Sequence, residues 1–435
     1  MSGYGDDPER GPVMAGPFRY VTPVEPQNAT GRTARVYGQL AEDFGMARMA
    51  VFLTLSPSPE VQAATWAMLR ESLLAGSAPR TDKEVVALGV SMANQCPFCV
   101  AAHTTLLHAT GDHRLAETVA RGDTPADPTH AALLTWAKAP SEGTWHPVSQ
   151  DAWDVGGQDA RHAGAQDARQ AGGQDAGPVG GAPAGPYPVE HAHEYIGTAL
   201  AFHFINRMAS ALLTDNLMPA GLQRSRLVRS VGGRVMSRAV RRRLRVGTSL
   251  ALVADLPAGP EPDWAAGTPV GAAYAALEVA ATAGGELLAG GARDGGGDAR
   301  AVVVGVVEAW DGSPLPMDTA WLDGPLAALP ADERPGARLA LLTALAPYRV
   351  TDADVAAWRG SKTDEDLVRL CAFGAITATK RVEALITAQE RADAPTTAAR
   401  RGEAPTAVPE RADAPTRAAR RGEDPSVETI TGERS

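Results

Sequence analysis

Apolar residues recur at every third or fourth position through most of the chain, which is the spacing of helices that pack one face against a core. The spacing is clear in residues 61–74, 84–92 and 100–107. It returns after residue 190 and predicts further helices at residues 200–213, 272–288, 301–310, 338–345 and 364–386. The pattern therefore predicts an all-α fold, arranged as a helical bundle.

Two segments lack this spacing. Residues 149–189 repeat the unit Gln-Asp-Ala and then run through Gly, Pro and Ala, and the segment from residue 387 repeats Glu-Arg-Ala-Asp-Ala-Pro-Thr. Such sequences bury too little apolar surface to offset the conformational entropy of an ordered backbone. We therefore expect five parts: a flexible N-terminus (1–17), a helical unit (18–148), a low-complexity linker (149–189), a second helical unit (190–386) and a disordered tail (387–435).

The two helical units contain similar segments, residues 81–86 in the first and residues 363–368 in the second, which suggests that they are related halves. Residue Asp366 in the second corresponds to Glu84 in the first. With the same offset, the positions that match Cys96, Cys99 and His103 hold Ala378, Arg381 and Leu385. The second unit therefore has no counterpart of the two cysteines and the histidine. Only the first unit is expected to keep its chemistry.

Charge and composition exclude several classes of protein. The net charge of -10 argues against nucleic acid as the main partner. The arginine-rich segment 224–245 is therefore interpreted as a solvated or subunit-contact surface. No apolar run of about 18 residues exists to span a membrane, and the polar first residues do not resemble a secretory signal. Three cysteines are too few for a disulfide scaffold. We expect a soluble, cytoplasmic protein.

Two cysteines and a histidine form the one stretch that specifies chemistry. Pro97 favours the first position of a helix, which would place Cys96 at the N-cap and Cys99 in the first turn. Both thiols would then lie at the positive end of the helix dipole. This position stabilises the thiolate and lowers the pKa of a thiol below its reference value of about 8.5. His103 follows Cys99 by four residues and shares its face of the helix.

Glu84 can join this group if the chain reverses between the two helices. In one straight helix it would lie about 18 Å from Cys96. Asn94 tolerates turn geometry, and Pro97 cannot continue a helix that began upstream, so we expect a break at residues 93–95. Glu84, His103 and Cys99 would then form a proton relay. This arrangement suits peroxide reduction, in which a thiolate attacks the O–O bond and the sulfenic acid condenses with the second thiol.

The spacing Glu84-x11-Cys96-x2-Cys99-x3-His103 is similar to the signature of the alkylhydroperoxidase AhpD-like group in the carboxymuconolactone decarboxylase family. The resemblance implies an all-helical fold and self-association, with Cys99 as the peroxidatic thiol, Cys96 as the resolving thiol, and Glu84 and His103 as the proton relay. It implies a small hydroperoxide substrate, no bound cofactor and an external dithiol of the thioredoxin or lipoyl type. Phe98 departs from the pattern, because the best-known peroxidase of this group has histidine there.

Other interpretations of these residues stay open. Thr81 and Glu84 also fit a capping box, in which the glutamate only closes a helix N-terminus. The two thiols and the imidazole could hold zinc if His108 or His113 completed the ligand set. Cys371 is interpreted as a buried apolar residue without a catalytic role.

A polar stripe lies on the otherwise apolar helix predicted at residues 200–213. It could line a substrate cavity, although interhelical hydrogen bonds are the simpler interpretation. Its members are His203, Asn206, Arg207 and Ser210. Two alternatives to a thiol peroxidase also remain: a lactone decarboxylase or related non-redox enzyme on the same scaffold, and a non-catalytic helical protein whose arginine-rich segment and tail recruit partners.

Overall fold

The computed structural model describes residues 16–142, 185–215, 236–257, 259–288, 298–316 and 318–393. Helices and short turns make up these segments, and their β-type pairing is limited to two isolated bridges, Phe18 with Leu213 and Ala75 with Leu244. The predicted all-α fold is confirmed. Most of the predicted N-terminus, linker and tail lies outside the described residues. None of the described helices is both long enough and apolar enough to cross a membrane.

Helices before the linker carry the predicted thiol site. They are α1 (Gly31–Phe44), α2 (Ala50–Leu55), α3 (Pro59–Leu69), α4 (Arg80–Ala93), α5 (Pro97–Thr110), α6 (His113–Ala120) and α7 (Pro128–Glu142), with a 3-10 turn η1 (Pro26–Asn28) and a π-turn η2 (Arg70–Leu74). The helical pattern at residues 61–74 thus divides into α3 and the wider turn η2.

Helices after the linker are α10 (Ala192–Leu212), α12 (Pro269–Thr282), α13 (Ala299–Ala309), α14 (Asp323–Ala327), α15 (Arg334–Leu345), α16 (Asp352–Arg359) and α17 (Asp364–Asp393). Short 3-10 turns join them: η3 (Val189–His191), η5 (Thr248–Leu252), η6 (Asp263–Ala265), η7 (Ala283–Leu288), η8 (Ala320–Leu322) and η9 (Pro347–Arg349). One boundary was wrong. α17 continues past residue 386 to Asp393, because Ala, Gln, Glu and Arg in that stretch all favour helix.

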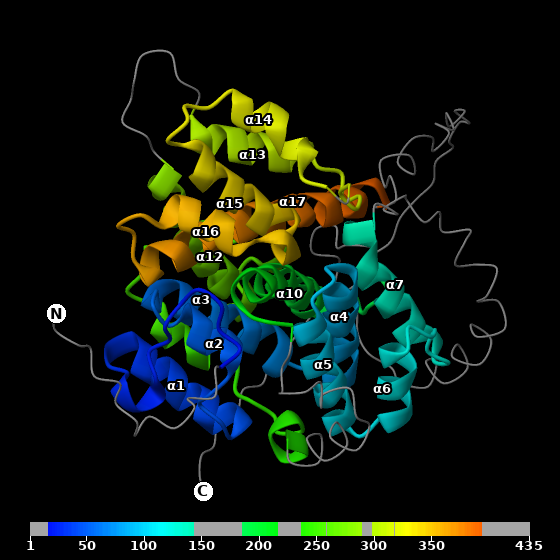
Figure 1. Ribbon diagram of the computed structural model, residues 1–435. Coiled ribbons are helices and arrows are strands. Elements are labelled where there is room, and N and C mark those ends of the chain that lie inside the picture. Colours follow the sequence, from blue (N-terminus) through cyan, green and yellow to red (C-terminus); the bar gives the residue numbers. More distant parts are fainter. Residues whose placement is uncertain are drawn as a thin grey trace, which may run out of the picture. The chain divides into compact units, whose positions relative to one another are not determined.

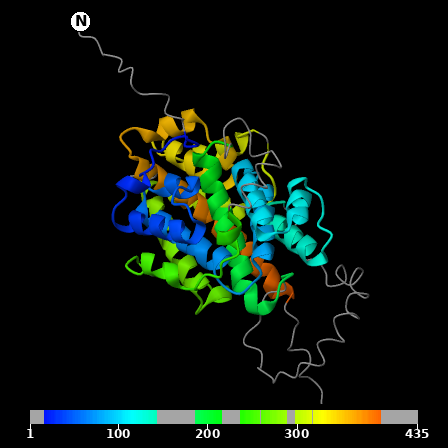
Figure 2. The same cartoon turned by 90° about the horizontal axis from the view of Figure 1, so that it is seen from below.

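Helix α10 lies in the middle of the structure (Figures 1 and 2). It packs against α3 and α4, which precede it in the chain, and against α17, which follows it. Nearly every residue of α10 is buried, including the members of its polar stripe His203, Asn206 and Arg207. Helices from both predicted units therefore form one compact unit, which extends to Ala394. The kinship of the two halves stays a prediction.

The chain reverses between α4 and α5, where the break was predicted. α4 ends at Ala93, α5 begins at Pro97, and Gln95 between them has a positive φ of 52°. The second unit has no such turn. Thr363 and Asp366 cap α17 reciprocally, and the helix then continues without interruption because Thr379 stands where the first unit has Pro97.

Candidate active site

The two thiols lie at the N-terminus of α5. Cys96 is the N-cap residue, and its Sγ accepts a hydrogen bond of 3.4 Å from the backbone N–H of Cys99. Both cysteines are free and buried, 1% and 3% exposed, among Ala209 and Leu213 of the central helix region. The predicted capping position of Cys96 is confirmed, and the sulfur itself makes the capping bond.

The two thiols differ in pKa, and the difference corrects one expectation. Burial raises the pKa of Cys99 well above its ordinary value, and the neighbouring Cys96 thiolate raises it further. Burial opposes ionisation of Cys96 as well, but donors from Cys99 and the nearby Ser210 hydroxyl outweigh it and lower the pKa of Cys96. The helix N-terminus therefore favours a thiolate at Cys96 first, and the expected lowering at Cys99 is wrong because desolvation exceeds the dipole effect.

Glu84 and His103 meet across the α4–α5 turn. Glu84 is fully buried, and its Oε2 lies 2.7 Å from Nδ1 of His103. Its other oxygen accepts hydrogen bonds of 2.8 and 2.6 Å from Nε and Nη2 of Arg80. Burial alone would raise the pKa of Glu84, but Arg80 and His103 together hold it below its ordinary value. Nδ1 of His103 is thus a donor, because an ionised carboxylate can only accept.

Arg80 was missed in the sequence analysis, although its spacing of four residues from Glu84 is a usable signal for an ion pair on one helix face. The capping-box interpretation of Glu84 is wrong. α4 begins at Arg80 with Pro79 as its N-cap residue, so Thr81 is already inside the helix.

A cavity of about 440 Å³ opens beside the thiols. Cys99 and His103 line it from α5, and Cys96 does not. Its other walls are mainly apolar and come from α1, α2 with its N-cap residue, α5 and α10; they include Phe44, Met49, Phe52, Leu106, Phe202 and Ile205. The ring of Phe202 meets His103 edge-on with centroids 4.3 Å apart. The cavity thus presents one thiol and one imidazole to an apolar space.

Two features of the expected relay differ from expectation. Among the described residues, His103 forms no hydrogen bond with either thiol, and its hydrogen-bond partner is Glu84 at Nδ1. Phe98 is buried and lines the same cavity, so the residue before Cys99 contributes an apolar ring to the cavity wall. The Glu84–His103 contact is present, while a direct link to Cys99 is not.

Cys371 and His108, which the sequence analysis also considered, make contacts within the fold and lie apart from the thiol pair. Cys371 is buried in α17, where burial raises its pKa to about 12 and Thr343 donates to its sulfur at 3.7 Å. In the part of the chain that the structure describes, no cluster of three or more metal-ligating side chains exists. His108 instead contacts His113 at 2.9 Å and Glu117 at 2.9 Å.

The polar stripe of α10 makes interhelical contacts. Nδ1 of His203 lies 3.3 Å from the amide of Asn94, and Ser91 donates to Asn206 at 3.2 Å. Arg207 donates from Nε to the carbonyl of Ala344 at 2.7 Å. The hydrogen-bonding interpretation is therefore confirmed for three members, and Arg207 additionally faces a small cavity that is described below.

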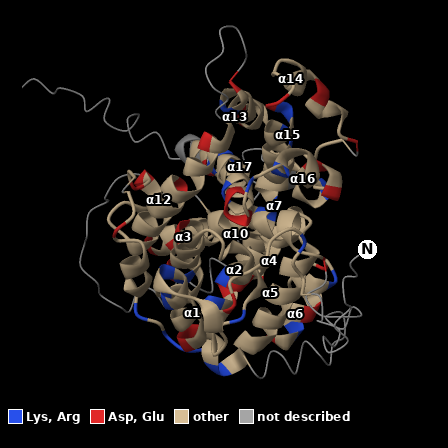
Figure 3. Ribbon diagram, turned by 60° about the vertical axis from the view of Figure 1, so that its left-hand side comes forward, with Lys and Arg blue, Asp and Glu red and all other residues tan. Residues whose placement is uncertain are grey.

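The arginine-rich segment is described only from residue 236 onward. Arg241, Arg242 and Arg243 line a polar cavity of about 360 Å³ together with Arg80. In the view of Figure 3, acidic and basic residues are interspersed along the described helices and turns.

This site lies within a recognisable family region. The sequence model of the carboxymuconolactone decarboxylase family matches residues 59–139, which span α3 to α7 and include Glu84, both thiols and His103. The chain belongs to this family. It is 37% identical to alkyl hydroperoxide reductase Rv2159c of Mycobacterium tuberculosis (strain ATCC 25618 / H37Rv) over 373 residues, which cover 85% of this chain and 95% of that protein. No solved structure matches the chain.

Proposed function

We propose that the protein is a thiol-dependent peroxidase that reduces hydroperoxides through a disulfide between Cys96 and Cys99. The observation that carries the proposal is the placement of Cys99 and His103 on the wall of one apolar cavity, with the second thiol one helical turn from Cys99. The name of the mycobacterial relative, an alkyl hydroperoxide reductase, supports the same class of reaction.

The first step uses the shared proton of the thiol pair. Because Cys96 ionises first, its thiolate accepts the Cys99 proton as the Cys99 sulfur attacks the distal peroxide oxygen. An S–O bond forms, the O–O bond breaks, and Cys99 becomes a sulfenic acid. The departing alkoxide takes a proton from Nε2 of His103, which reacts as the imidazolium with its Nδ1–H held by Glu84.

The second step closes the disulfide. The Cys96 sulfur attacks the Cys99 sulfenic acid and water leaves, so that one peroxide is reduced to an alcohol and two thiols are oxidised. An external dithiol, of the thioredoxin or lipoyl type, reduces the disulfide, and its two protons return to Cys99 and His103, which leaves Cys96 as the thiolate. We keep self-association, a cytoplasmic location and the absence of a bound cofactor as part of this proposal.

The cavity favours organic hydroperoxides over hydrogen peroxide. A volume of about 440 Å³ is within the usual range for small-molecule sites, and its walls are mainly hydrocarbon. Burial of an alkyl or aryl group there contributes about 25 cal/mol per Å² of apolar surface. Hydrogen peroxide has no such group, so we expect a lower kcat/KM for it than for cumene hydroperoxide.

Thiol counting with cumene hydroperoxide tests the proposal. We expect the wild type and Cys371→Ser each to lose two thiols per peroxide, with Cys371→Ser as the matched control for a buried cysteine. Cys96→Ser also lacks the thiolate that accepts the Cys99 proton, so it should react more slowly and stop at a sulfenic acid on residue 99 that dimedone traps. Cys99→Ser should lose no thiol. A full reaction in Cys99→Ser, or no thiol loss in the wild type, would contradict the proposal.

A non-redox enzyme is the second candidate, because the matching family model is named for a lactone decarboxylase and covers the same residues. Its chemistry would not need paired thiols. Turnover of a muconolactone by the Cys96→Ser/Cys99→Ser double variant at the wild-type rate would favour this candidate over the peroxidase.

A further inference from the structure

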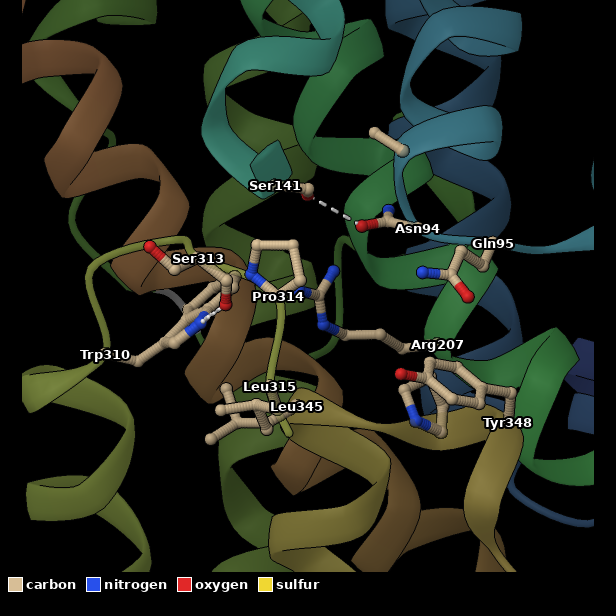
Figure 4. A pocket seen from close by; sticks show the side chains of 12 residues that line it. Asn94, Gln95, Ser141, Arg207, Trp310, Ser313, Pro314, Leu315, Leu345 and Tyr348 are labelled. Atoms are coloured by element: carbon tan, nitrogen blue, oxygen red, sulfur yellow. Dashed lines mark hydrogen bonds between the residues drawn. The ribbon is translucent and has the colours of Figure 1, made fainter. Parts of the chain in front are cut away.

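A second, smaller cavity lies beside the α4–α5 turn, lined in part by the residues that precede Cys96 (Figure 4). Its volume is about 50 Å³. Polar side chains from four parts of the chain reach it: Asn94, Gln95, Arg207, Ser313 and Tyr348. No residue lines both this cavity and the one beside Cys99, so the smaller cavity is separate from the proposed peroxide site.

Arg207 is the unusual member of this group. It is only 4% exposed, its guanidinium lies over the Trp310 ring with Cζ 5.9 Å from the ring centroid, and no acidic side chain among the described residues forms an ion pair with it. Burial lowers its pKa to about 10, so the guanidinium still carries its charge at neutral pH. An unpaired buried charge costs several kcal/mol in general, so a protein that keeps one usually has a counter-ion for it.

The hydrogen bonds of Arg207 leave one nitrogen available. Nε donates to the carbonyl of Ala344 and Nη1 donates to the carbonyl of His203, both at 2.7 Å. Nη2 has no partner among the described residues. In Figure 4 the guanidinium points between Pro314 and the segment that carries Asn94, toward the centre of the cavity. The charge is therefore directed at the empty space and not at a protein carboxylate.

Other groups around the cavity are neutral and can donate. Within the described structure, the side chains of Gln95, Ser313 and Tyr348 have no hydrogen-bond partner, so their amide and hydroxyl groups are free to turn toward an anion. His203 adds no charge, because burial and the adjacent Arg207 lower its pKa well below its ordinary value. The cavity thus combines one buried cation with neutral donors.

We propose that this cavity binds a small monovalent anion, a carboxylate of formate size or a halide, on Nη2 of Arg207. Its volume of about 50 Å³ is more than one water needs, so a small anion fits in it. The anion would hold the Asn94–Gln95 segment against α10. This site does not depend on the peroxidase proposal.

Thermal unfolding at constant ionic strength tests the site, with sodium gluconate as the large-anion reference. An anion that binds only the folded state raises Tm with its concentration. We expect formate or chloride to raise the Tm of the wild type above its value in gluconate, and the stronger of the two identifies carboxylate or halide as the preferred class. Arg207→Gln should lose the anion-dependent rise.

Arg338→Gln is the matched control, because Arg338 is a partly buried arginine whose charge is already paired with Asp354 at 2.7 Å. It should keep the full anion-dependent rise. Ser313→Ala and Gln95→Ala each remove one donor without removing the charge, and both should reduce the rise. These two variants still test the site if Arg207→Gln does not fold. Equal Tm in all three salts, or an unchanged rise in the three cavity variants, would overturn the proposal.

Bromide soaked into crystals of the full chain gives a direct readout of position. We expect an anomalous peak within hydrogen-bond distance of Nη2 of Arg207. Peaks confined to exposed arginines would also overturn the proposal.

Discussion

Single residues at the thiol site are controlled more by burial than by the helix end. Cys96 and Cys99 share one helix N-terminus, yet the pKa of Cys96 is lowered and that of Cys99 is raised. The difference arises because Cys96 accepts hydrogen bonds as a thiolate, whereas Cys99 donates and has no acceptor role. The two thiols therefore titrate as a coupled pair. The first proton leaves from Cys96, and Cys99 keeps the second.

Thiolate absorbance as a function of pH checks this order. In Cys99→Ala, Cys96 loses a thiol donor, so its pKa should rise and less thiolate should form at pH 8. In Cys96→Ala, the adjacent negative charge is gone, so the pKa of Cys99 should fall from its wild-type value. Cys371→Ala should leave the curve unchanged below about pH 10, because the pKa of that thiol is about 12. Opposite shifts in the two site variants would contradict the order.

Arg80 should control the protonation of Glu84. The pKa of Glu84 is depressed in the folded state, so the ionised carboxylate stabilises the fold above its unfolded pKa of about 4.3, and this stabilisation is lost as the pH falls. Arg80→Met raises the folded pKa. We expect a loss of about 2 kcal/mol at pH 7 and acid unfolding at a higher pH than in the wild type.

Circular dichroism during acid titration measures this shift. Arg114→Met on α6 is the control, since Arg114 is exposed and forms no ion pair with a described residue. An acid midpoint in Arg80→Met equal to that of the control would mean that Arg80 does not hold Glu84 ionised.

At the scale of elements, α4 and α7 pack closely against each other. Gly89 on α4 makes the approach possible, because a Cβ there would lie 2.9 Å from Cβ of Ala137 and 3.2 Å from Leu134. Alanine is more favourable than glycine inside a helix by about 1 kcal/mol. A Gly→Ala variant therefore destabilises a helix only where the added methyl group is too close to its neighbours.

Two Gly→Ala variants should have opposite effects on stability. Gly38→Ala, at an exposed position in α1 with nothing within 4 Å of the added carbon, should stabilise by up to about 1 kcal/mol. Gly89→Ala should destabilise by about 1–2 kcal/mol, because the overpacking cost exceeds the propensity gain. Urea unfolding measures both changes, and stabilisation by Gly89→Ala would show that α7 yields to the added methyl group.

At the scale of the whole molecule, a buried ion pair joins the two predicted units. Nζ of Lys83 on α4 lies 2.6 Å from Oε2 of Glu194 on α10, and both side chains are 2% exposed. Glu194 also accepts from the backbone N–H of Ser77 at 2.9 Å. These contacts fix the start of α4, and with it Arg80 and Glu84, against the central helix.

Removal of either partner should destabilise the whole fold. Glu194→Gln and Lys83→Met each leave a buried charge without its partner, which costs about 3–5 kcal/mol. The double variant should lose less than the sum of the two. Urea unfolding followed by fluorescence and by circular dichroism should give one coincident transition, since both units share the core; a transition confined to one unit would contradict this coupling.

The sequence by itself determined the local geometry. Helical periodicity predicted most helices, and Pro97 predicted both the break after α4 and the capping position of Cys96. These features depend on residues within about one turn of each other, so the order of residues is enough to specify them. The approach of Glu84 to His103 followed from the same turn.

Tertiary structure decided the rest. The cavity beside Cys99 is formed by side chains far apart in sequence, from Phe44 to Phe202. Burial reversed the expected pKa of Cys99 and left Arg207 charged without a carboxylate. The physical reason is that desolvation depends on all neighbours in space, and those neighbours come from helices whose packing no local pattern specifies.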